Sequence, residues 1–578
     1  METRACQNCK TSFNIEPDDF TFYDKIDVPA PTWCPHCRLI RRLTWRNERT
    51  LHKRTCSLCA RSIIATYPEN TPFPVYCRDC WFSDQWDPLS YGKEYDFSKN
   101  FFEQLHELFN DVPQIGMQVS NSPRSEYINQ ATHCKNCYLV TSASDNEDCF
   151  YSNRILHCKN VCDCLAVHST ENSYEVKESR DSNNLLYSDD CHGSFNLSFC
   201  YDCRNCSDCF MSSNLRSKTH VWYGEQLTRE EFQKRIEKVN LGSHDEMKKY
   251  IEEYNVLKTR SITRFSKQKS TTQCSGNNIV NANNCRNSFY VSEVENASNL
   301  LFVDNAKDVY DTNNGCCTME RIYEVNTTGI NVSDIRFSSD AWPEIQNATY
   351  TISCRNGAHD LFGCIGVQKK SYCILNKQYT QDEYKDLVTK IKKHMSDMPY
   401  IDANGCSYAF GEFFPPELSP FAFNESAAYT YTSLPKEKVI EYGWRWKELE
   451  TKGYVPTISS ADLPDDIKNV PDSITQEIIA CEHQGACDEQ CPGAFRIIPT
   501  ELEFYRAKNL PLPRLCPNCR HYQRVKQMPV FQLYARKCMC QKNNHNHDNE
   551  CMNTFETSYS LGRPEAIYCE QCYQKEVL

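Results

Sequence analysis

Paired cysteines near both ends of the chain have the spacing of metal ligands. Two cysteines separated by two residues can bind one ion with both thiolates, and two such pairs complete a tetrahedron around zinc. Four pairs occur within residues 1–80, and the helix-like, basic segment 38–55 between them favours two separate ribbons over an interleaved pairing. The predicted ligands are Cys6, Cys9, Cys34 and Cys37 at the first site, and Cys56, Cys59, Cys77 and Cys80 at the second.

A second copy of this pattern lies at the C-terminal end. Adding 482, and later 492, to cysteine positions of the first copy reaches cysteines of the second, so ten residues are inserted between Cys538 and Cys551. The flank SFNIEPDDFTFY (12–23) repeats as AFRIIPTELEFY (494–505). The predicted ligands are Cys487, Cys491, Cys516 and Cys519, and then Cys538, Cys551, Cys569 and Cys572. We therefore expect about four zinc ions in closed, structural sites.

Residues without a counterpart in the first copy are expected to lie outside the metal sites. For this reason Cys481 and Cys540 are interpreted as spectator thiols, which bind no metal. The inserted loop QKNNHNHDNE (541–550) contains His545 and His547, and both side chains are expected to be solvated rather than bound to metal.

The cysteine content indicates a reducing compartment. The chain has 578 residues, 37 cysteines and a formal net charge of −12, and we find no apolar run typical of a signal peptide or membrane span. Cysteines in ribbon spacing favour zinc over disulfides, so the expected location is the cytoplasm, or the interior of a virus particle if the source is viral. We expect no membrane partner. The negative charge provides no general attraction to nucleic acid.

Basic and aromatic residues lie between the paired zinc sites of each module. A helix that carries them could bind phosphates by charge and stack a base on its aromatic ring. The possible nucleic-acid contacts are Arg41, Arg42, Trp45, Arg46, Arg520 and Arg524. The alternative is a solvated helix face whose arginines pair with acidic neighbours.

Short apolar segments recur through the middle of the chain. Six steps lead from Tyr138 to Phe210, so the mean step is 12, and Asn, Asp and Ser fill the gaps. Such spacing indicates a β-solenoid or a sandwich, and Asn ladders with small inward-facing residues favour the solenoid. The run Cys200, Cys203, Cys206 and Cys209 is interpreted as buried thiols stacked inside it, with a surface metal clip as the alternative.

The middle of the chain is itself duplicated, because adding 152 to positions of its first half reaches their counterparts in the second. Its halves end in related segments, GEQLTREEFQKRIEKV (224–239) and NKQYTQDEYKDLVTKI (376–391). Thr228 and Thr380 each precede a glutamate by three residues, which is the pattern of a capping box. Helices are therefore predicted over 228–239 and 380–391, where each would cover the open edge of the last coil.

The predicted fold class is mainly β with peripheral helices (α+β): a duplicated β-solenoid body flanked by duplicated zinc-ribbon modules. Helical spacing in FFEQLHELF (101–109) and KEKVIEYGWRWKELE (436–450) predicts two further helices, the first ended by Pro113. The predicted segments are an N-terminal double zinc-ribbon module (1–85), a helical connector (86–125), a first solenoid half with its closing helix (126–240), a helical linker (241–284), a second solenoid half with its closing helix (285–400), a Pro- and aromatic-rich linker with a helix (401–480) and a C-terminal double zinc-ribbon module (481–578).

The segment TCSLCARSIIATYPENTPFPVYCRDC (55–80) resembles zinc ribbons closely. The layout of nearly the whole chain is similar to that of uncharacterised multi-zinc proteins of candidate-phylum bacteria and large DNA viruses. Because those proteins have no established activity, the resemblance implies an architecture and a zinc content but no function.

The motifs favour a structural role over catalysis. The P-loop, nucleophile-elbow, zinc-protease and dinucleotide-binding signatures are absent from the sequence, so an enzyme is not the first expectation. We expect a zinc-stabilised structural or interaction scaffold with a protein partner. One alternative is a nucleic-acid-binding protein that uses the Arg-rich connectors, and another is a β-helix enzyme that acts on a polymeric substrate.

Overall fold

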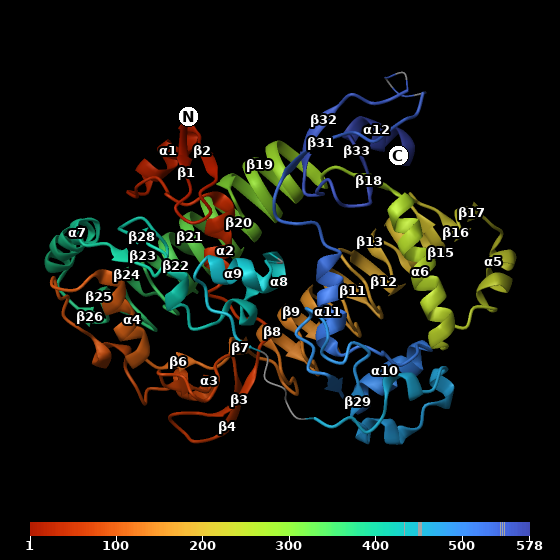
Figure 1. The fold of residues 1–578 in the computed structure, drawn as a ribbon, viewed down its shortest axis with the longest axis horizontal. Helices are drawn as coiled ribbons and strands as arrows, with labels where there is room; N and C mark the ends of the chain where they lie inside the picture. The colour runs from red at the N-terminus through yellow and green to blue at the C-terminus, as the bar shows by residue number, and fades with distance from the viewer. Residues whose placement is uncertain (433, 449–453, 544, 546, 548) are drawn as a thin grey trace.

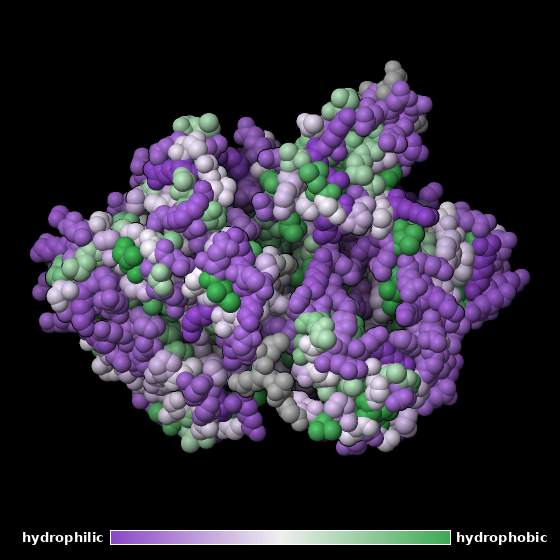
Figure 2. Space-filling model, in the orientation of Figure 1, coloured by the Kyte–Doolittle hydropathy of each residue, from purple (hydrophilic) through white to green (hydrophobic). Residues whose placement is uncertain are grey.

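Two β-solenoids form the body of the molecule, with a cysteine-rich module packed on each (Figure 1). The computed structural model describes residues 1–578 except 433, 449–453, 544, 546 and 548. The predicted class, mainly β with a solenoid body and cysteine-rich ends, is confirmed. The face seen in Figure 2 is largely hydrophilic, with scattered hydrophobic residues. No helix in the described part of the chain is long and apolar enough to cross a membrane.

The first solenoid has coils of the length expected from the sequence period. Asn129 pairs with Thr141, Thr141 with Asn153, and Asn153 with Leu165, all in parallel. Its strands are β7 (Val119–Ser120), β8 (Asn129–Lys135), β9 (Thr141–Glu147), β10 (Asn153–Leu156), β11 (Leu165–Glu171), β12 (Arg180–Leu186), β13 (Asp189–His192), β14 (Phe195–Arg204), β15 (Ser207–Ser213), β16 (Thr219–Trp222) and β17 (Glu225–Gln226).

The second solenoid begins inside the segment expected to be a linker. Its first strand starts at Gln268, and its coil lengthens by one residue between the pairing of Phe289 with Leu301 and that of Val309 with Ile322. The strands are β19 (Gln268–Ser298), β20 (Leu301–Cys316), β21 (Met319–Gly329), β22 (Val332–Ala341), β23 (Gln346–Thr349), β24 (His359–Phe362), β25 (Ser371–Ile374) and β26 (Lys377–Gln378).

Asparagine supports the tight coils. Along much of both solenoids every third residue has a positive φ, as at Asn160 (52°) and Asp163 (56°), and Asn and Asp tolerate this region better than most residues. Asn side chains also bond between coils: Asn160 Nδ2 donates to Asn172 Oδ1 at 2.8 Å. Small apolar side chains fill the interior. The thiols of the densest cysteine run are buried there: Cys200, Cys203 and Cys206 are 0% exposed and Cys209 is 1% exposed.

The two closing helices form as predicted. Helix α5 (Arg229–Ile236) and helix α7 (Gln381–Asp397) both begin with a complete capping box, at Thr228 and Thr380. Each packs on the last coil through an aromatic pair: the ring centroids of Phe232 and Trp222 lie 6.1 Å apart. In the second solenoid the ring centroids of Tyr384 and Tyr372 lie 5.8 Å apart.

The connecting segments contain further short elements. Helix α4 (Phe101–Asp111) agrees with the predicted helix, whereas α9 (Lys436–Glu441) is shorter than expected, and residues 449 and 450 of that prediction lie outside the described residues. The others are α6 (His244–Arg260), α8 (Ala427–Thr432), β6 (Gln114–Ile115), β18 (Ile262–Arg264), β27 (Tyr400–Ile401), β28 (Ser407–Tyr408), and 3₁₀ turns at Pro88–Tyr91, Pro416–Leu418, Phe423–Glu425, Ser460–Asp462, Ile467–Asn469 and Asp472–Gln476.

Helices α2 and α11 of the cysteine-rich modules each pack on the solenoid farther from them in sequence. Helix α2 contacts β20 and β21 of the second solenoid, while Arg520 of α11 pairs with Asp163 of the first. The N-terminal elements are β1 (Glu2–Ala5), β2 (Ser12–Ile15), α1 (Pro17–Lys25), α2 (Pro35–Leu43), β3 (His52–Thr55), β4 (Ser62–Ala65), β5 (Val75–Tyr76) and α3 (Arg78–Trp81). The C-terminal elements are β29 (Ile479–Ala480), β30 (Ala494–Phe495), α10 (Pro499–Lys508), α11 (Pro517–Lys526), β31 (Tyr534–Lys537), β32 (Thr554–Thr557), β33 (Ala566–Tyr568) and α12 (Glu570–Val577).

Candidate metal centres

Four cysteine groups share one local geometry. In each, a cysteine follows a strand of a short hairpin, and another caps the helix that returns to it, as Cys6 after β1 and Cys34 before α2. The backbone N–H of the helix-capping cysteine donates to the Sγ of the hairpin cysteine at 3.2 Å in all four. These contacts join Cys34 to Cys6, Cys77 to Cys56, Cys516 to Cys481 and Cys569 to Cys538.

The thiols of each group lie at the distances expected around a single ion. All Sγ atoms of a group lie within 4.8 Å of one another. The groups are Cys6, Cys9, Cys34 and Cys37; Cys56, Cys59, Cys77 and Cys80; Cys481, Cys491, Cys516 and Cys519; and Cys538, Cys551, Cys569 and Cys572. Zn–S bonds of about 2.3 Å at tetrahedral angles separate neighbouring sulfurs by about 3.8 Å. The Sγ atoms of Cys9 and Cys34 are 3.8 Å apart and those of Cys551 and Cys569 are 3.9 Å apart.

These separations fit metal ligands and not disulfides. A disulfide would bring two sulfurs to about 2.05 Å, and all 37 cysteines are free thiols. The grouping is also sequential within each module, so the interleaved alternative is excluded for these four groups. Four groups of four thiols could therefore each hold a metal ion.

The third group differs from the sequence-based prediction. Cys481, expected to be a spectator, follows β29 as Cys6 follows β1, and it receives the N–H of Cys516. Cys481 therefore occupies the position equivalent to that of Cys6, and the choice between Cys481 and Cys487 as the fourth ligand stays a prediction. Cys487 lies in the lengthened hairpin loop, with its Sγ 3.7 Å from that of Cys519, so it is a fifth thiol beside the group.

The inserted loop also differs from the prediction. Cys540 Sγ lies 3.1 Å from His545 Nδ1, and Cys572 Sγ lies 3.4 Å from His547 Nε2. The His545 side chain is only 2% exposed. The expectation that His545 is solvated is wrong, because the loop folds back and brings Cys540, His545 and His547 beside the fourth group.

One thiol of the N-terminal module is activated by a neighbouring arginine. Arg61 Nε donates to Cys59 Sγ at 3.3 Å, and this hydrogen bond lowers the pKa of the Cys59 thiol to about 6. Because the thiolate is the form that binds metal, the contact favours binding at neutral pH.

The six residues considered for nucleic-acid contact are in the interior. Their exposed fractions are 0% for Arg41, 0% for Arg42, 9% for Trp45, 5% for Arg46, 5% for Arg520 and 2% for Arg524. The expectation that they face solvent is wrong, because α2 lies against the second solenoid and α11 against the first. Phosphates have no access to these side chains in this structure.

Acidic residues of the second solenoid and the linker accept hydrogen bonds from the arginines of α2. Arg41 donates to Glu324 at 2.9 Å and to Glu412 at 2.7 Å, and its guanidinium lies 4.6 Å from the Trp33 ring. Burial alone would lower the pKa of Arg41, but the two carboxylates outweigh it and raise the pKa. Arg41 therefore links the helix to the solenoid as a charged, buried side chain.

Helix α11 repeats this arrangement on the first solenoid. Arg38 and Arg520 occupy equivalent helix positions; Arg38 donates to Asp311 at 2.8 Å, and Arg520 donates to Asp163. Arg524 is 2.8 Å from Asp163 and 2.7 Å from Glu175. Helices at equivalent places in the two modules thus hold the two solenoids by buried ion pairs.

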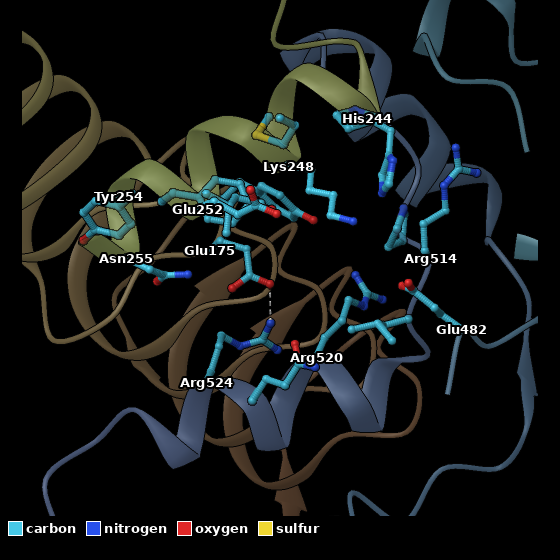
Figure 3. A pocket seen from close by; sticks show the side chains of 18 of the residues that line it. Glu175, His244, Lys248, Glu252, Tyr254, Asn255, Glu482, Arg514, Arg520 and Arg524 are labelled. Atoms are coloured by element: carbon cyan, nitrogen blue, oxygen red, sulfur yellow. Dashed lines mark hydrogen bonds and ion pairs between the residues drawn. The ribbon is translucent and has the colours of Figure 1, made fainter. Parts of the chain in front are cut away.

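A cleft opens beside these pairs, between the first solenoid, α6 and α11 (Figure 3). Its volume is about 430 Å³, and its polar lining includes Lys248, Glu482 and Arg514. The Glu175 carboxylate at its wall is held by Arg524, as the dashed line in Figure 3 shows. Both acidic and basic side chains line the cleft, which makes it a candidate binding surface.

No protein-family model matches this chain, and no curated protein matches its sequence. Among solved structures, one similar chain is described as a "putative acetyltransferase from Desulfovibrio desulfuricans G20". It shares 10% sequence identity over 51% of this chain and 74% of that chain, with a TM-score of 0.10. At this TM-score the likeness carries no inference about fold or function.

Proposed function

We propose that this protein is a zinc-stabilised interaction scaffold, in which structural zinc ions fix the two end modules and the modules hold two solenoids together for a protein partner. The observation that carries the proposal is the fourfold repetition of one thiol geometry, with the same 3.2 Å contact from N–H to Sγ. A closed site of four thiolates leaves no position for water or substrate, which is typical of structural zinc.

The separation of the thiols favours single zinc ions. Tetrahedral sets of four thiolates suit zinc or iron–sulfur clusters. A cluster stands between its cysteines and keeps their sulfurs farther apart than one ion does. Separations of 3.8 Å between Cys9 and Cys34 and 3.9 Å between Cys59 and Cys77 therefore support a single ion in each N-terminal group.

The metal groups support the solenoids through helices α2 and α11. Cys34 and Cys516 are the residues that cap α2 and α11, so an ion bound there fixes the start of each helix. The same helices carry the buried arginines that pair with Asp311 and Asp163. Loss of metal would release the helix ends and weaken both contacts with the solenoids.

The partner is proposed to be a protein. Stacked coils present long, regular surfaces of the kind that repeat proteins use for protein recognition. The nucleic-acid alternative depended on six side chains that are buried here, so we do not propose it. The polymer-acting enzyme alternative gains no support from Glu175, which is paired with Arg524, although Glu252 and Glu482 also line the cleft.

Metal analysis and hydrogen exchange test the proposal. Full-length protein purified without added zinc should contain at least four zinc ions. Removal of the metal with a chelator should raise amide exchange in α2 and α11 and in the strands that they cover. Fewer than four ions, or unchanged protection in the metal-free protein, would contradict the proposal. Cross-linking to co-purified proteins should then place the partner on the solenoid surfaces or at the cleft.

A further inference from the structure

The inserted loop of the C-terminal module and the adjoining Cys540 bring three further donor atoms to the fourth thiol group. The donor atoms of Cys540, His545, His547 and Cys572 all lie within 4.8 Å of one another. With Zn–S and Zn–N bonds of about 2.3 and 2.1 Å, neighbouring ligand atoms in a tetrahedron are about 3.6 Å apart. The two sulfur–nitrogen contacts of 3.1 and 3.4 Å are close to this value.

We propose that these four side chains bind a further metal ion, which the Cys572 thiolate bridges to the ion of the fourth thiol group. Cys572 is a member of both sets of ligands. A thiolate sulfur that binds one ion retains lone pairs, so it can bind a second soft or borderline cation. Two thiolates and two imidazoles are a common zinc set.

The orientation of His545 supports this assignment. Its Nε2 donates to Glu576 Oε1 of α12 at 2.9 Å, so the proton is held on that nitrogen and the lone pair of Nδ1 faces Cys540. A carboxylate on the far nitrogen is the usual outer partner of a metal-bound histidine, because it fixes the tautomer and the ring.

The charge balance of the fourth group also favours a further ion. Four thiolates around one divalent ion leave two negative charges in a site whose cysteines are buried. With Cys540 added and two ions present, five thiolates leave only one negative charge, because the two imidazoles are neutral. A second ion therefore lowers the electrostatic cost of keeping these thiolates out of water.

The first module provides an internal comparison. Only two residues separate Cys56 from Cys59, and Leu58 occupies the position that corresponds to Cys540. In the second module the Cys551 N–H donates to the Cys540 carbonyl at 3.0 Å, which closes the neck of the inserted loop. The insertion therefore adds ligands without changing the four-thiolate frame that the two modules share.

Native mass spectrometry of the full chain, loaded with zinc and then freed of excess metal, tests the inference. We expect five ions in the unaltered protein. We expect four in the double variant His545→Asn/His547→Asn and four in Cys540→Ser, because each retains the four-thiolate group. The control Asn549→Ala, in the same loop, should retain five.

Two results would overturn the inference: four ions in the unaltered protein, or five in the double histidine variant. A count below four in the unaltered protein would instead contradict the proposed zinc scaffold, so the two failures are distinguishable. The bridge has its own readout after substitution with ¹¹³Cd. Two coupled cadmium signals are expected, one from an all-sulfur site and one from a mixed site, and uncoupled signals would exclude the shared Cys572.

Discussion

Arg154 of the first solenoid donates from Nη2 to Glu48 Oε1 of the N-terminal module at 3.1 Å. The same carboxylate accepts from Arg46 at 2.8 Å and from the Tyr431 hydroxyl of α8 at 3.1 Å. Arg154 also donates to Asn314 of the second solenoid at 2.8 Å. One buried carboxylate and its arginine therefore connect the N-terminal module, both solenoids and the linker.

Acid should weaken this junction. Burial would raise the pKa of Glu48, but Arg154 and Arg46 lower it from 4.5 to about 2. Because the folded state binds its proton less tightly than the unfolded state, the stabilisation is complete above pH 4.5 and is lost as the pH falls toward 2. The shift corresponds to about 3 kcal/mol.

The variant Glu48→Gln isolates this effect from other carboxylates. At neutral pH it leaves two arginines without their charged partner, so it should reduce the free energy of unfolding by about 3–5 kcal/mol. The difference between the variant and the unaltered protein should become smaller from pH 6 to pH 2.5 in urea unfolding curves. A difference independent of pH would contradict the depressed pKa of Glu48.

The third thiol group can be assigned by two matched substitutions. Cys481→Ser should remove one zinc ion, because Cys481 has the position and the Cys516 N–H contact of a ligand. Cys487→Ser should retain the full metal content, because Cys487 lies in the loop beside the group. Metal analysis of both purified variants distinguishes the two thiols, and the reverse result would restore the assignment made from sequence offsets.

The solenoid was predictable because the sequence repeats with the same period that separates paired residues of neighbouring coils. A strand residue such as Asn129 pairs with Thr141, one coil further along the chain, so the periodicity of the sequence is also the register. The capping boxes at Thr228 and Thr380 were predictable because they depend on residues three apart. Local chemistry of this kind can be read without knowledge of the tertiary fold.

The remaining features depend on contacts between distant segments. Nothing near Arg41 in the sequence indicates Glu324 or Glu412, so its burial could not be foreseen. The offset that relates most of the cysteines fails at Cys481, because the hairpin loop before Cys491 is longer than the loop between Cys6 and Cys9. The apolar pair before Cys481, which forms β29, was the available signal for the correct alignment.

Charge reversal at Arg42 should affect stability rather than nucleic-acid binding. The Arg42 side chain donates to Asp311 at 3.2 Å, to Glu324 at 3.2 Å and to Asn313 at 2.9 Å. Arg42→Glu would place a third carboxylate in this buried cluster, so it should cost at least the roughly 3–5 kcal/mol of a broken buried pair.

Lys53→Glu is the matched control, because Lys53 is exposed on β3 of the same module. It should change the free energy of unfolding by less than about 1 kcal/mol. Urea midpoints of the two variants provide the comparison. An Arg42→Glu protein that is as stable as the control would show that α2 does not lie against the second solenoid in solution.

The capping box of α7 should stabilise the end of the second solenoid. Thr380 Oγ1 accepts the Glu383 N–H at 3.4 Å, and Glu383 accepts the Thr380 N–H at 3.0 Å. Thr380→Ala removes the first bond and should cost about 1 kcal/mol. The loss should appear as faster amide exchange in α7 and in β25, on which the helix packs.

Thr389→Ala, in the exposed middle of the same helix, is the control. It should be neutral or slightly stabilising, because alanine has the higher helix propensity. Equal effects of the two substitutions would mean that the cap does not hold the closing helix on the last coil.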